Sequence, residues 1–176
     1  GMATEMLPSE ETEYEIYTRT QELLGEAGYH HYEISNYARP GYECRHNIGY
    51  WKRADYLGLG LGAASLIENV RCSNLSDLSS YIEETADIHA VEADGIPQGI
   101  TTNLHEQADA VTRKAQIEEY MFLGLRMTEG ITRAAFRNIF GVEIEAVYGD
   151  LLPVLIDEGL ICMEAGILRL TKRGTD

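Results

Sequence analysis

Long apolar runs, paired cysteines and an excess of positive charge are all missing from this 176-residue chain. No apolar run reaches the roughly 20 residues that a membrane span requires. The first residues lack the charged, apolar and small-residue pattern of a signal peptide. The sequence therefore predicts a cytoplasmic protein without a membrane span.

Cysteine is scarce, and its three positions, Cys44, Cys72 and Cys162, are far apart. Their spacing matches neither the C-x-x-C pairs of zinc sites nor the C-x-x-x-C-x-x-C run that holds an iron–sulfur cluster. We therefore expect three reduced thiols that do not hold a cluster by themselves.

Positive charge is also scarce, with 14 Lys and Arg against 29 Asp and Glu, for a formal net charge of −15. Such a charge repels phosphate backbones, which argues against a nucleic-acid partner. The imbalance is uneven, since residues 1–110 carry −13 and residues 111–176 carry −2. This asymmetry, in a chain with 44% hydrophobic residues, supports two globular units.

The first third of the chain alternates helical and extended patterns. Apolar residues recur at helical spacing from Ile16 to Ala27 and stop at Gly28, and a short β-rich segment, 29–34, follows at once. Residues 36–47 are rich in turn residues and predict a loop, and residues 56–60 predict a second strand. A helix that leads directly into a strand indicates an α/β unit.

The second half predicts helices followed by a hairpin. After a helix from Ser76 and an irregular segment, 87–108, a helical pattern covers residues 109–125. Three short helices and a hairpin around Glu164-Ala165-Gly166 then give the order of a winged-helix module. The helix in the place of a DNA-recognition helix, 150–158, has no Lys or Arg, so packing or substrate-lid duty fits better than DNA binding.

Aromatic, charged and polar side chains that could bind a ligand are densest between residues 33 and 51. Aromatic rings stack on flat ligands and arginines bind carboxylates, so this segment predicts a site for a flat or anionic ligand. The alternative is that the aromatic residues anchor the loop and the charges are solvated. A single histidine is also more often structural than a metal ligand. The cluster comprises Glu33, Ser35, Asn36, Tyr37, Arg39, Tyr42, Arg45, His46, Asn47, Tyr50 and Trp51.

Four strings together resemble one known family: Y-E-I-S-N-Y-A at 32–38, R-H-N at 45–47 with Y-W at 50–51, D-Y-L-G at 55–58, and G-A-A-S at 62–65. The chain resembles the oxygen-independent coproporphyrinogen III oxidase-like family of radical S-adenosylmethionine proteins. The H-N-x-x-Y-W string, which begins at His46, is similar to the haem-chaperone branch. The resemblance extends to M-F-L-G-L-R at 121–126 and T-E-G at 128–130.

This resemblance implies an α/β fold, namely the C-terminal part of a partial (β/α) barrel followed by a small winged-helix-like domain with a β-hairpin. We accordingly expect barrel residues at 1–75, a connecting helix and irregular segment at 76–110, and the winged-helix-like domain at 111–176. The stretch from Thr171 to Gly174 resembles the entry to one more helix, so the chain reads as a fragment of a longer protein.

The resemblance also implies ligands. The full-length protein would hold a 4Fe-4S cluster and S-adenosylmethionine, and its partners would be a porphyrin or haem and haem-receiving proteins. The cluster-binding cysteines are absent from this sequence, so the fragment alone would be inactive. A histidine usual in the family's G-A-H-S string is replaced by Ala64, which puts any role of that histidine in doubt.

Site residues follow from the same resemblance. Glu33 and Ala63 match positions that line the S-adenosylmethionine pocket. The leading hypothesis is haem binding for transfer to apo-proteins, with His46 as the iron ligand and Asn47, Tyr50 and Trp51 beside the macrocycle. One alternative is oxidative decarboxylation of coproporphyrinogen III to protoporphyrinogen IX, with Arg39 and Arg45 on the propionates. Another is a winged-helix interaction module.

Overall fold

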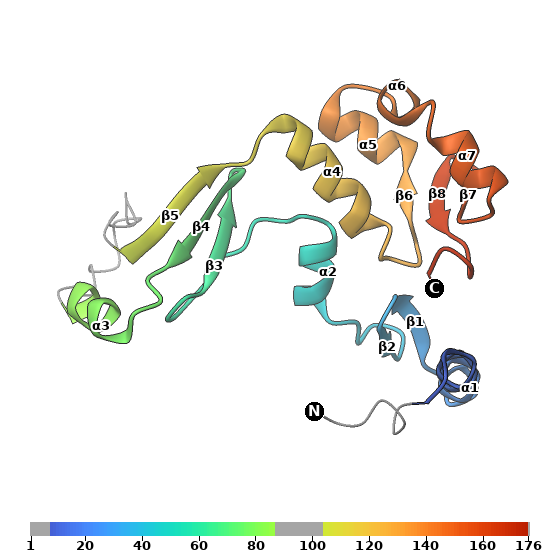
Figure 1. Cartoon of the computed structure of the whole chain (residues 1–176), viewed down its shortest axis with the longest axis horizontal. Coiled ribbons are helices and arrows are strands. Elements are labelled where there is room, and N and C mark those ends of the chain that lie inside the picture. The colour runs from blue at the N-terminus through green and yellow to red at the C-terminus, as the bar shows by residue number, and fades with distance from the viewer. Residues whose placement is uncertain (1–7, 87–103, 176) are drawn as a thin grey trace. The chain divides into compact units, whose positions relative to one another are not determined.

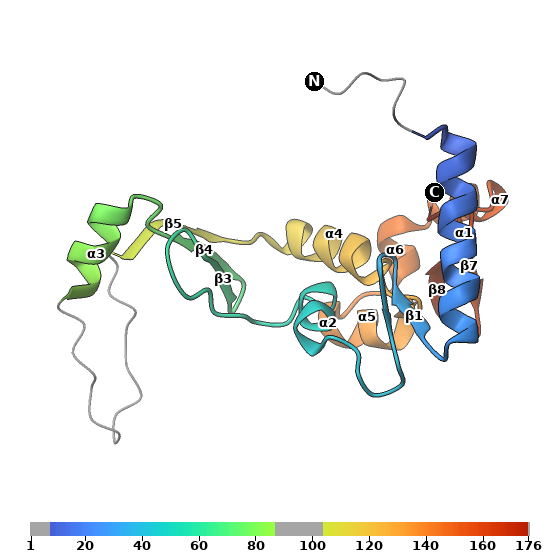
Figure 2. The ribbon, with the colours of Figure 1, turned by 90° about the horizontal axis from the view of Figure 1, so that it is seen from below.

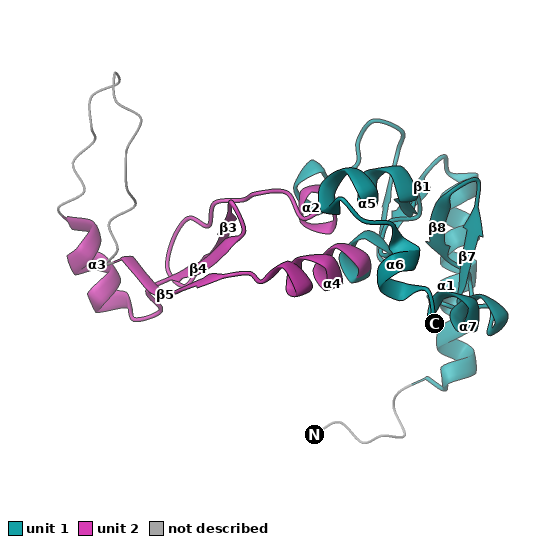
Figure 3. Cartoon of the chain, turned by 90° about the horizontal axis from the view of Figure 1, so that it is seen from above, with its two compact units in different colours: residues 1–48, 122–176 teal, residues 49–121 magenta. Residues whose placement is uncertain are grey.

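The structure is a computed structural model that describes residues 8–86 and 104–175. Its contacts divide the chain into two compact units: unit 1 comprises residues 1–48 and 122–176, and unit 2 comprises residues 49–121 (Figure 3). This grouping joins the two ends of the chain in one unit, whereas the sequence suggested boundaries near residues 75 and 110. Those domain boundaries stay a prediction.

Unit 1 begins with helix α1, Glu10–Glu26, which the sequence predicts. The Ser9 hydroxyl caps it by accepting a hydrogen bond from the Thr12 amide at 3.3 Å, and three glutamates in the first turn favour this helix end. The chain then turns at Gly28, whose φ of +82° suits glycine, into strand β1, His30–Glu33 (Figures 1 and 2). Strand β2, Asn36–Ala38, pairs antiparallel with β1.

The other side of β1 pairs with a segment that lies some ninety residues later in the sequence. The Ile34 amide donates to the carbonyl of Arg126 at 3.0 Å, and the Thr128 amide donates to the carbonyl of Tyr32 at 3.2 Å. A single antiparallel bridge joins Glu33 to Met127. These backbone N–H and C=O groups of β1 and of the segment after α4 are therefore hydrogen-bonded to each other within unit 1.

The C-terminal part of unit 1 has the element order of a winged helix (Figure 1). Thr132 caps one helix by accepting from the Ala135 amide at 3.0 Å, and Gly141 ends that helix at a φ of +65°. The three strands pair antiparallel in the order β6-β8-β7. The elements are β6 Ile131–Thr132, α5 Arg133–Phe140, α6 Ile144–Tyr148, α7 Leu152–Asp157, β7 Ile161–Glu164 and β8 Ile167–Leu170. The predicted helices and hairpin are confirmed.

The core of unit 1 lies between these helices and the small sheet. Phe136, Ile144 and Leu168 are fully buried, and the ring of Phe136 lies 4.9 Å from that of Phe140, centroid to centroid. The backbone packs as closely as the side chains, since a Cβ at Gly130 would lie 2.2 Å from the Leu168 carbonyl oxygen. Glycine is therefore required where the chain enters β6.

Unit 2 holds a three-stranded antiparallel sheet in the order β3-β4-β5 and the predicted helix α3, Leu78–Ala86. Its strands are Ala64–Ile67, Val70–Asn74 and His105–Ala110. The predicted strand at 56–60 is wrong, because only Tyr56 pairs, in a single bridge with Leu66. Strand β5 replaces the irregular structure expected at 105–108 and the first two residues of the helix expected at 109–125. Residues 87–103 of the predicted irregular segment lie outside the described residues.

Helix α4, Arg113–Gly124, follows β5 as the sequence predicts. The α/β class is confirmed, although every strand pair among the described residues is antiparallel and these residues form no closed barrel. Within residues 8–86 and 104–175, no helix has the length and apolar character needed to cross a membrane.

An ionic cluster ties α4 to the hairpin of unit 2. The Glu119 carboxylate accepts hydrogen bonds from Nε of Arg53 at 2.8 Å and from both terminal nitrogens of Arg71 at 2.9 and 3.1 Å. Arg53 also donates to the Asn69 side chain at 2.7 Å. Sequence reasoning missed this cluster because its members are far apart in the chain and no local pattern marks them.

Because of this cluster, the free energy of unfolding of unit 2 depends on pH. Burial alone would raise the pKa of Glu119, but the hydrogen bonds from Arg71 and Arg53, with their charges, hold it below its usual range. Because the folded-state pKa is lowered, the stabilisation is present above the unfolded pKa and is lost as the pH falls below about 4.5. We expect Glu119→Gln to weaken unit 2 by roughly 1–2 kcal/mol at neutral pH and to flatten this acid dependence.

Amide hydrogen exchange of strand β4 measures this effect. The matched control is Glu118→Gln, since Glu118 is the exposed neighbour on α4 and lies 3.7 Å from the Lys114 ammonium. Equal exchange rates in the two variants would contradict a stabilising role for the Arg53–Glu119–Arg71 cluster.

Candidate functional site

Glu33, at the end of β1, is fully buried. One carboxylate oxygen accepts hydrogen bonds from the Ser35 amide at 2.9 Å and from the Asn36 side-chain amide at 2.5 Å. The other lies 3.5 Å from a guanidinium nitrogen of Arg126. The carboxylate thus holds the β1–β2 turn through two hydrogen bonds, and its charge offsets that of Arg126 from the segment that follows α4. Sequence reasoning did not include Arg126, although it ends the M-F-L-G-L-R string.

Ala63, the other residue expected at the S-adenosylmethionine pocket, lies in the turn before β3. Its carbonyl accepts from the Asn74 amide at 2.9 Å, and its own amide donates to the Gly60 carbonyl at 3.3 Å. Glu33 belongs to unit 1 and Ala63 to unit 2. A role for these two residues at a shared S-adenosylmethionine pocket stays a prediction.

The segment after Cys44 is a helix, which corrects the expected loop at 36–47. Helix α2, Arg45–Trp51, opens with a hydrogen bond from the Ile48 amide to the Cys44 carbonyl at 3.0 Å and ends as the Arg53 amide bonds to the Tyr50 carbonyl at 3.0 Å. Asn36 to Ala38, also assigned to that loop, form β2. Turn residues at Pro40 and Gly41 favoured a loop, and the seven-residue helix is too short for its apolar period to stand out.

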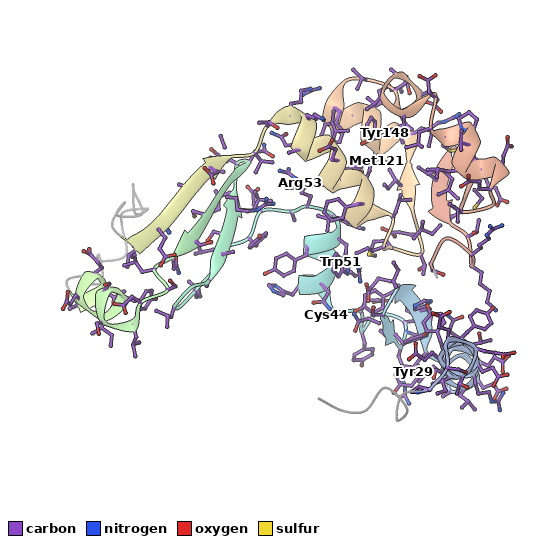
Figure 4. All side chains as sticks on the ribbon, viewed as in Figure 1. Tyr29, Cys44, Trp51, Arg53, Met121 and Tyr148 are labelled. Carbon is purple, nitrogen blue, oxygen red and sulfur yellow. The ribbon has the colours of Figure 1, made fainter. Side chains whose placement is uncertain are left out.

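Helix α2 gathers five of the predicted site residues, Arg45 among them, on one short element. His46 and Tyr50 are four positions apart, so they lie on the same helix face. The His46 side chain is exposed, while Asn47, Tyr50 and Trp51 are half-buried; Figure 4 labels Trp51 on this helix. The Tyr50 ring packs edge-on against Tyr56, with centroids 4.6 Å apart. At least one ring of this segment therefore has an aromatic partner within the protein.

The predicted arginines are exposed and lie at different places. The Arg39 guanidinium lies 5.3 Å above the ring centroid of Tyr29, and Arg45 is the first residue of α2. Tyr42, between them in the sequence, is 84% exposed, so its ring faces solvent. Arg39 thus has an aromatic partner within unit 1, and no shared position for the two arginines follows from the described contacts.

The two histidines of β1 have separate partners. His30 lies 3.0 Å from the Glu43 carboxylate, and the His31 ring stacks on Tyr37 with centroids 4.4 Å apart. Backbone hydrogen bonds from Glu43 itself and from Gly41, followed by the charge of His30, lower the pKa of Glu43. These contacts brace the hairpin that precedes α2.

The described residues contain no group of three His, Cys, Asp or Glu side chains that could hold a metal ion. Cys44, Cys72 and Cys162 are free thiols. The described residues therefore do not fit an iron–sulfur cluster.

Comparisons with known proteins support the resemblance found from the sequence. Residues 111–176 match the family described as HemN C-terminal domain. The protein named heme chaperone HemW of Bacillus subtilis is 36% identical, covering 96% of this chain and 41% of that protein. Its namesake in Lactococcus lactis is 32% identical, covering 96% of this chain and 40% of that protein.

A solved structure, that of the radical SAM enzyme coproporphyrinogen III oxidase (HemN) from Escherichia coli, matches 98% of this chain with a TM-score of 0.68. At 19% identity this likeness shows the fold alone, and the chain spans 40% of that protein. The chain likewise spans about two fifths of the curated relatives. Over nearly its whole length the chain is therefore similar to proteins named heme chaperone HemW, and its residues 111–176 match the HemN C-terminal domain family.

Proposed function

We propose that the protein binds haem for delivery to apo-proteins, with His46 as an axial ligand of the haem iron. The observation that carries the proposal is helix α2, which holds an exposed histidine one turn before Tyr50 and next to Asn47. A ligand of the iron must be reached from solvent, and His46 is an exposed residue. The names of the relatives, heme chaperone HemW, support haem as the cargo.

Within this proposal, Tyr50 and Trp51 pack beside the macrocycle and Arg39 and Arg45 supply charge for its propionates. Aromatic faces suit a flat porphyrin, and guanidinium groups pair with carboxylates. The exposed positions of both arginines are compatible with this role. The full-length protein would hold a 4Fe-4S cluster and S-adenosylmethionine, the cluster through cysteines outside this sequence, with Glu33 and Ala63 near S-adenosylmethionine.

Haem titration of the chain, followed by the Soret band, tests the proposal. We expect saturable binding by the wild type and a loss of affinity of at least about tenfold in His46→Ala, because a ligand to the iron is removed. The matched control is His30→Ala, since His30 is another partly exposed histidine of unit 1 whose partner is Glu43. Equal binding by wild type and His46→Ala would remove His46 from the ligand role.

The oxidase alternative receives less support. The relatives at 36% and 32% identity are named heme chaperone HemW, whereas the oxidase matches at 19% identity, which shows the fold alone. A DNA-binding role is opposed by the recognition-helix position, where α7, Leu152–Asp157, has no basic residue. Transfer of haem to receiving proteins and the cytoplasmic location remain predictions from the sequence.

A further inference from the structure

Helix α7 carries apolar side chains on every side, although it lies at the surface of unit 1. Residues 151–156 read L-L-P-V-L-I, a run that is longer than one helical turn. Leu152 is the one buried residue of α7, and Leu155 is half-buried. Three other side chains of the run, which we call the α7 patch, are 48%, 49% and 40% exposed: Leu151, Val154 and Ile156.

The core of unit 1 uses the inward side of this helix. Leu152 and Leu155 are three positions apart, so they lie on one helix face. After α7 the chain turns at Gly159, with a φ of +70°, and the Leu160 amide donates to the Leu155 carbonyl at 2.9 Å, which holds α7 beside β7 (Figure 1). A helix that is apolar all round is normally enclosed. The α7 patch therefore has the composition of a helix face that another surface covers.

The charged residues that flank the α7 patch in the sequence are all negative. Between Arg137 and Arg169 there are six Asp and Glu and no Lys or Arg. Asp150 precedes the patch, and Asp157 and Glu158 follow it. No cation among residues 8–86 and 104–175 pairs with these three carboxylates, whereas the two glutamates at the start of α6 each pair with an arginine of α5. A partner that covers the α7 patch must therefore supply the positive charge.

We propose that the α7 patch docks a helical segment of another protein, in which Lys or Arg residues flank apolar side chains. The apolar residues of that segment bury the patch, and its cations pair with Asp150 at one end and with Asp157 and Glu158 at the other. Apolar burial favours association, and complementary charge sets register and partner choice. Helix α7 stands where a winged helix presents its recognition helix, so it is placed for docking. The proposal does not rest on haem binding, because it uses no residue of α2.

The spacing of the charges defines the partner further. Seven positions separate Asp150 from Asp157, about two helical turns. A partner helix matches this spacing when two of its cations are also seven positions apart and apolar residues stand three and four positions after the first. Nucleic acids and anionic membranes attract Lys and Arg, so they are unsuited to a helix with carboxylates at both ends. A second copy of this chain would bring like charges together.

Fluorescence anisotropy with a labelled synthetic peptide tests this surface. The peptide has this Lys and Leu spacing repeated over about three heptads, which is long enough to form a helix. We expect saturable binding that weakens at least about tenfold when Leu151→Gln and Val154→Thr are combined, because both changes put polar groups into the apolar contact at similar size. Asp157→Asn should weaken binding by about threefold and lessen its salt dependence.

The matched control is Ile16→Thr on α1. Ile16 is 56% exposed and lies next to Glu15 in a helix that is also acidic. This variant should bind the peptide within about twofold of the wild type, because general attraction between a basic peptide and an acidic chain does not depend on α7. A peptide with Glu in place of each Lys should bind at least about tenfold more weakly. Circular dichroism checks that each variant is folded.

Hydroxyl-radical footprinting of the wild type does not depend on the folding of any variant. The Lys and Leu peptide should protect Leu151 and Ile156 and leave Ile16 reactive. The proposal would be overturned by a lack of saturable binding, by equal weakening in Ile16→Thr, by equal binding of the Glu peptide, or by reactivity of α7 that the peptide leaves unchanged.

Three further results would assign the α7 patch to a different occupant and so overturn the proposal. A dimer of the free chain that is lost in the Leu151→Gln, Val154→Thr double variant, as read by sedimentation, would indicate a second copy. Binding to neutral phosphatidylcholine vesicles that is lost in the same variant would indicate a membrane surface. Peptide binding by this chain but not by a longer protein that contains it would indicate that residues of the longer protein cover α7.

Discussion

Replacing Phe136 with Ala is expected to lower the free energy of unfolding by about 3–5 kcal/mol, the range seen when a buried aromatic ring is truncated. The ring is fully buried on α5, next to Phe140, and belongs to the core that also contains Ile144 and Leu168. Removing it loses the transfer free energy of the ring and leaves a cavity, because neighbours fixed by the β6-β8-β7 sheet relax only partly.

Urea unfolding followed by circular dichroism measures this loss. The matched control is Ile139→Ala on the same helix, where the side chain is 56% exposed and the change should stay within about 0.5 kcal/mol. Similar midpoints for the two variants would mean that the core of unit 1 is not centred on Phe136. A drop of this size would bring a small unit close to unfolding, so haem titrations are informative only on variants outside this core.

The helices other than α2, and the C-terminal hairpin, could be predicted from the sequence because their signals are local. Ser9 and Thr132 cap their helices, Gly28 and Gly141 end helical runs at positive φ, and Ala165-Gly166 forms the tight turn between β7 and β8. Each signal depends on residues within one turn of the position it marks. Such patterns survive in any fold that keeps the same local backbone.

The errors arise where pairing between distant residues decides the structure. Strand β5 forms because Val70 to Asn74 offer it a partner edge, and nothing between residues 105 and 110 alternates strongly enough to predict that pairing. Conversely, the apolar run at 56–60 lacks a continuous partner and pairs only through Tyr56. Strand propensity describes fit to neighbours rather than an intrinsic preference, so a single sequence could not rank these two segments.

The candidate site was predicted by its residue types and missed in its geometry. The density of aromatic and charged side chains singled out residues 33–51, and the structure gathers His46, Asn47, Tyr50 and Trp51 on α2. The partner of Glu33 could not be foreseen, because Arg126 lies 93 positions away.

Replacing Glu33 with Ala is expected to destabilise unit 1 by about 3–5 kcal/mol, because it removes the buried carboxylate that accepts the hydrogen bonds of its neighbours. The Ser35 amide, the Asn36 side chain and the Arg126 guanidinium would all lose a partner. The control Glu22→Ala breaks an exposed ion pair with Arg19 on α1, at 2.8 Å, and should cost less than about 1 kcal/mol. Unfolding in urea compares the two variants directly.

A double-mutant cycle with Arg126→Met separates a structural Glu33 from one that serves a ligand alone. If the carboxylate balances Arg126, removing both groups should cost less than the sum of the two single changes. Each single variant leaves one charged group without its partner, whereas the double variant leaves no unpaired charge. A Glu33→Ala variant as stable as the wild type would contradict this role and would leave S-adenosylmethionine contact as the better account. Loss of stability would mean that weakened cofactor binding in a longer protein cannot by itself assign Glu33 to the cofactor pocket.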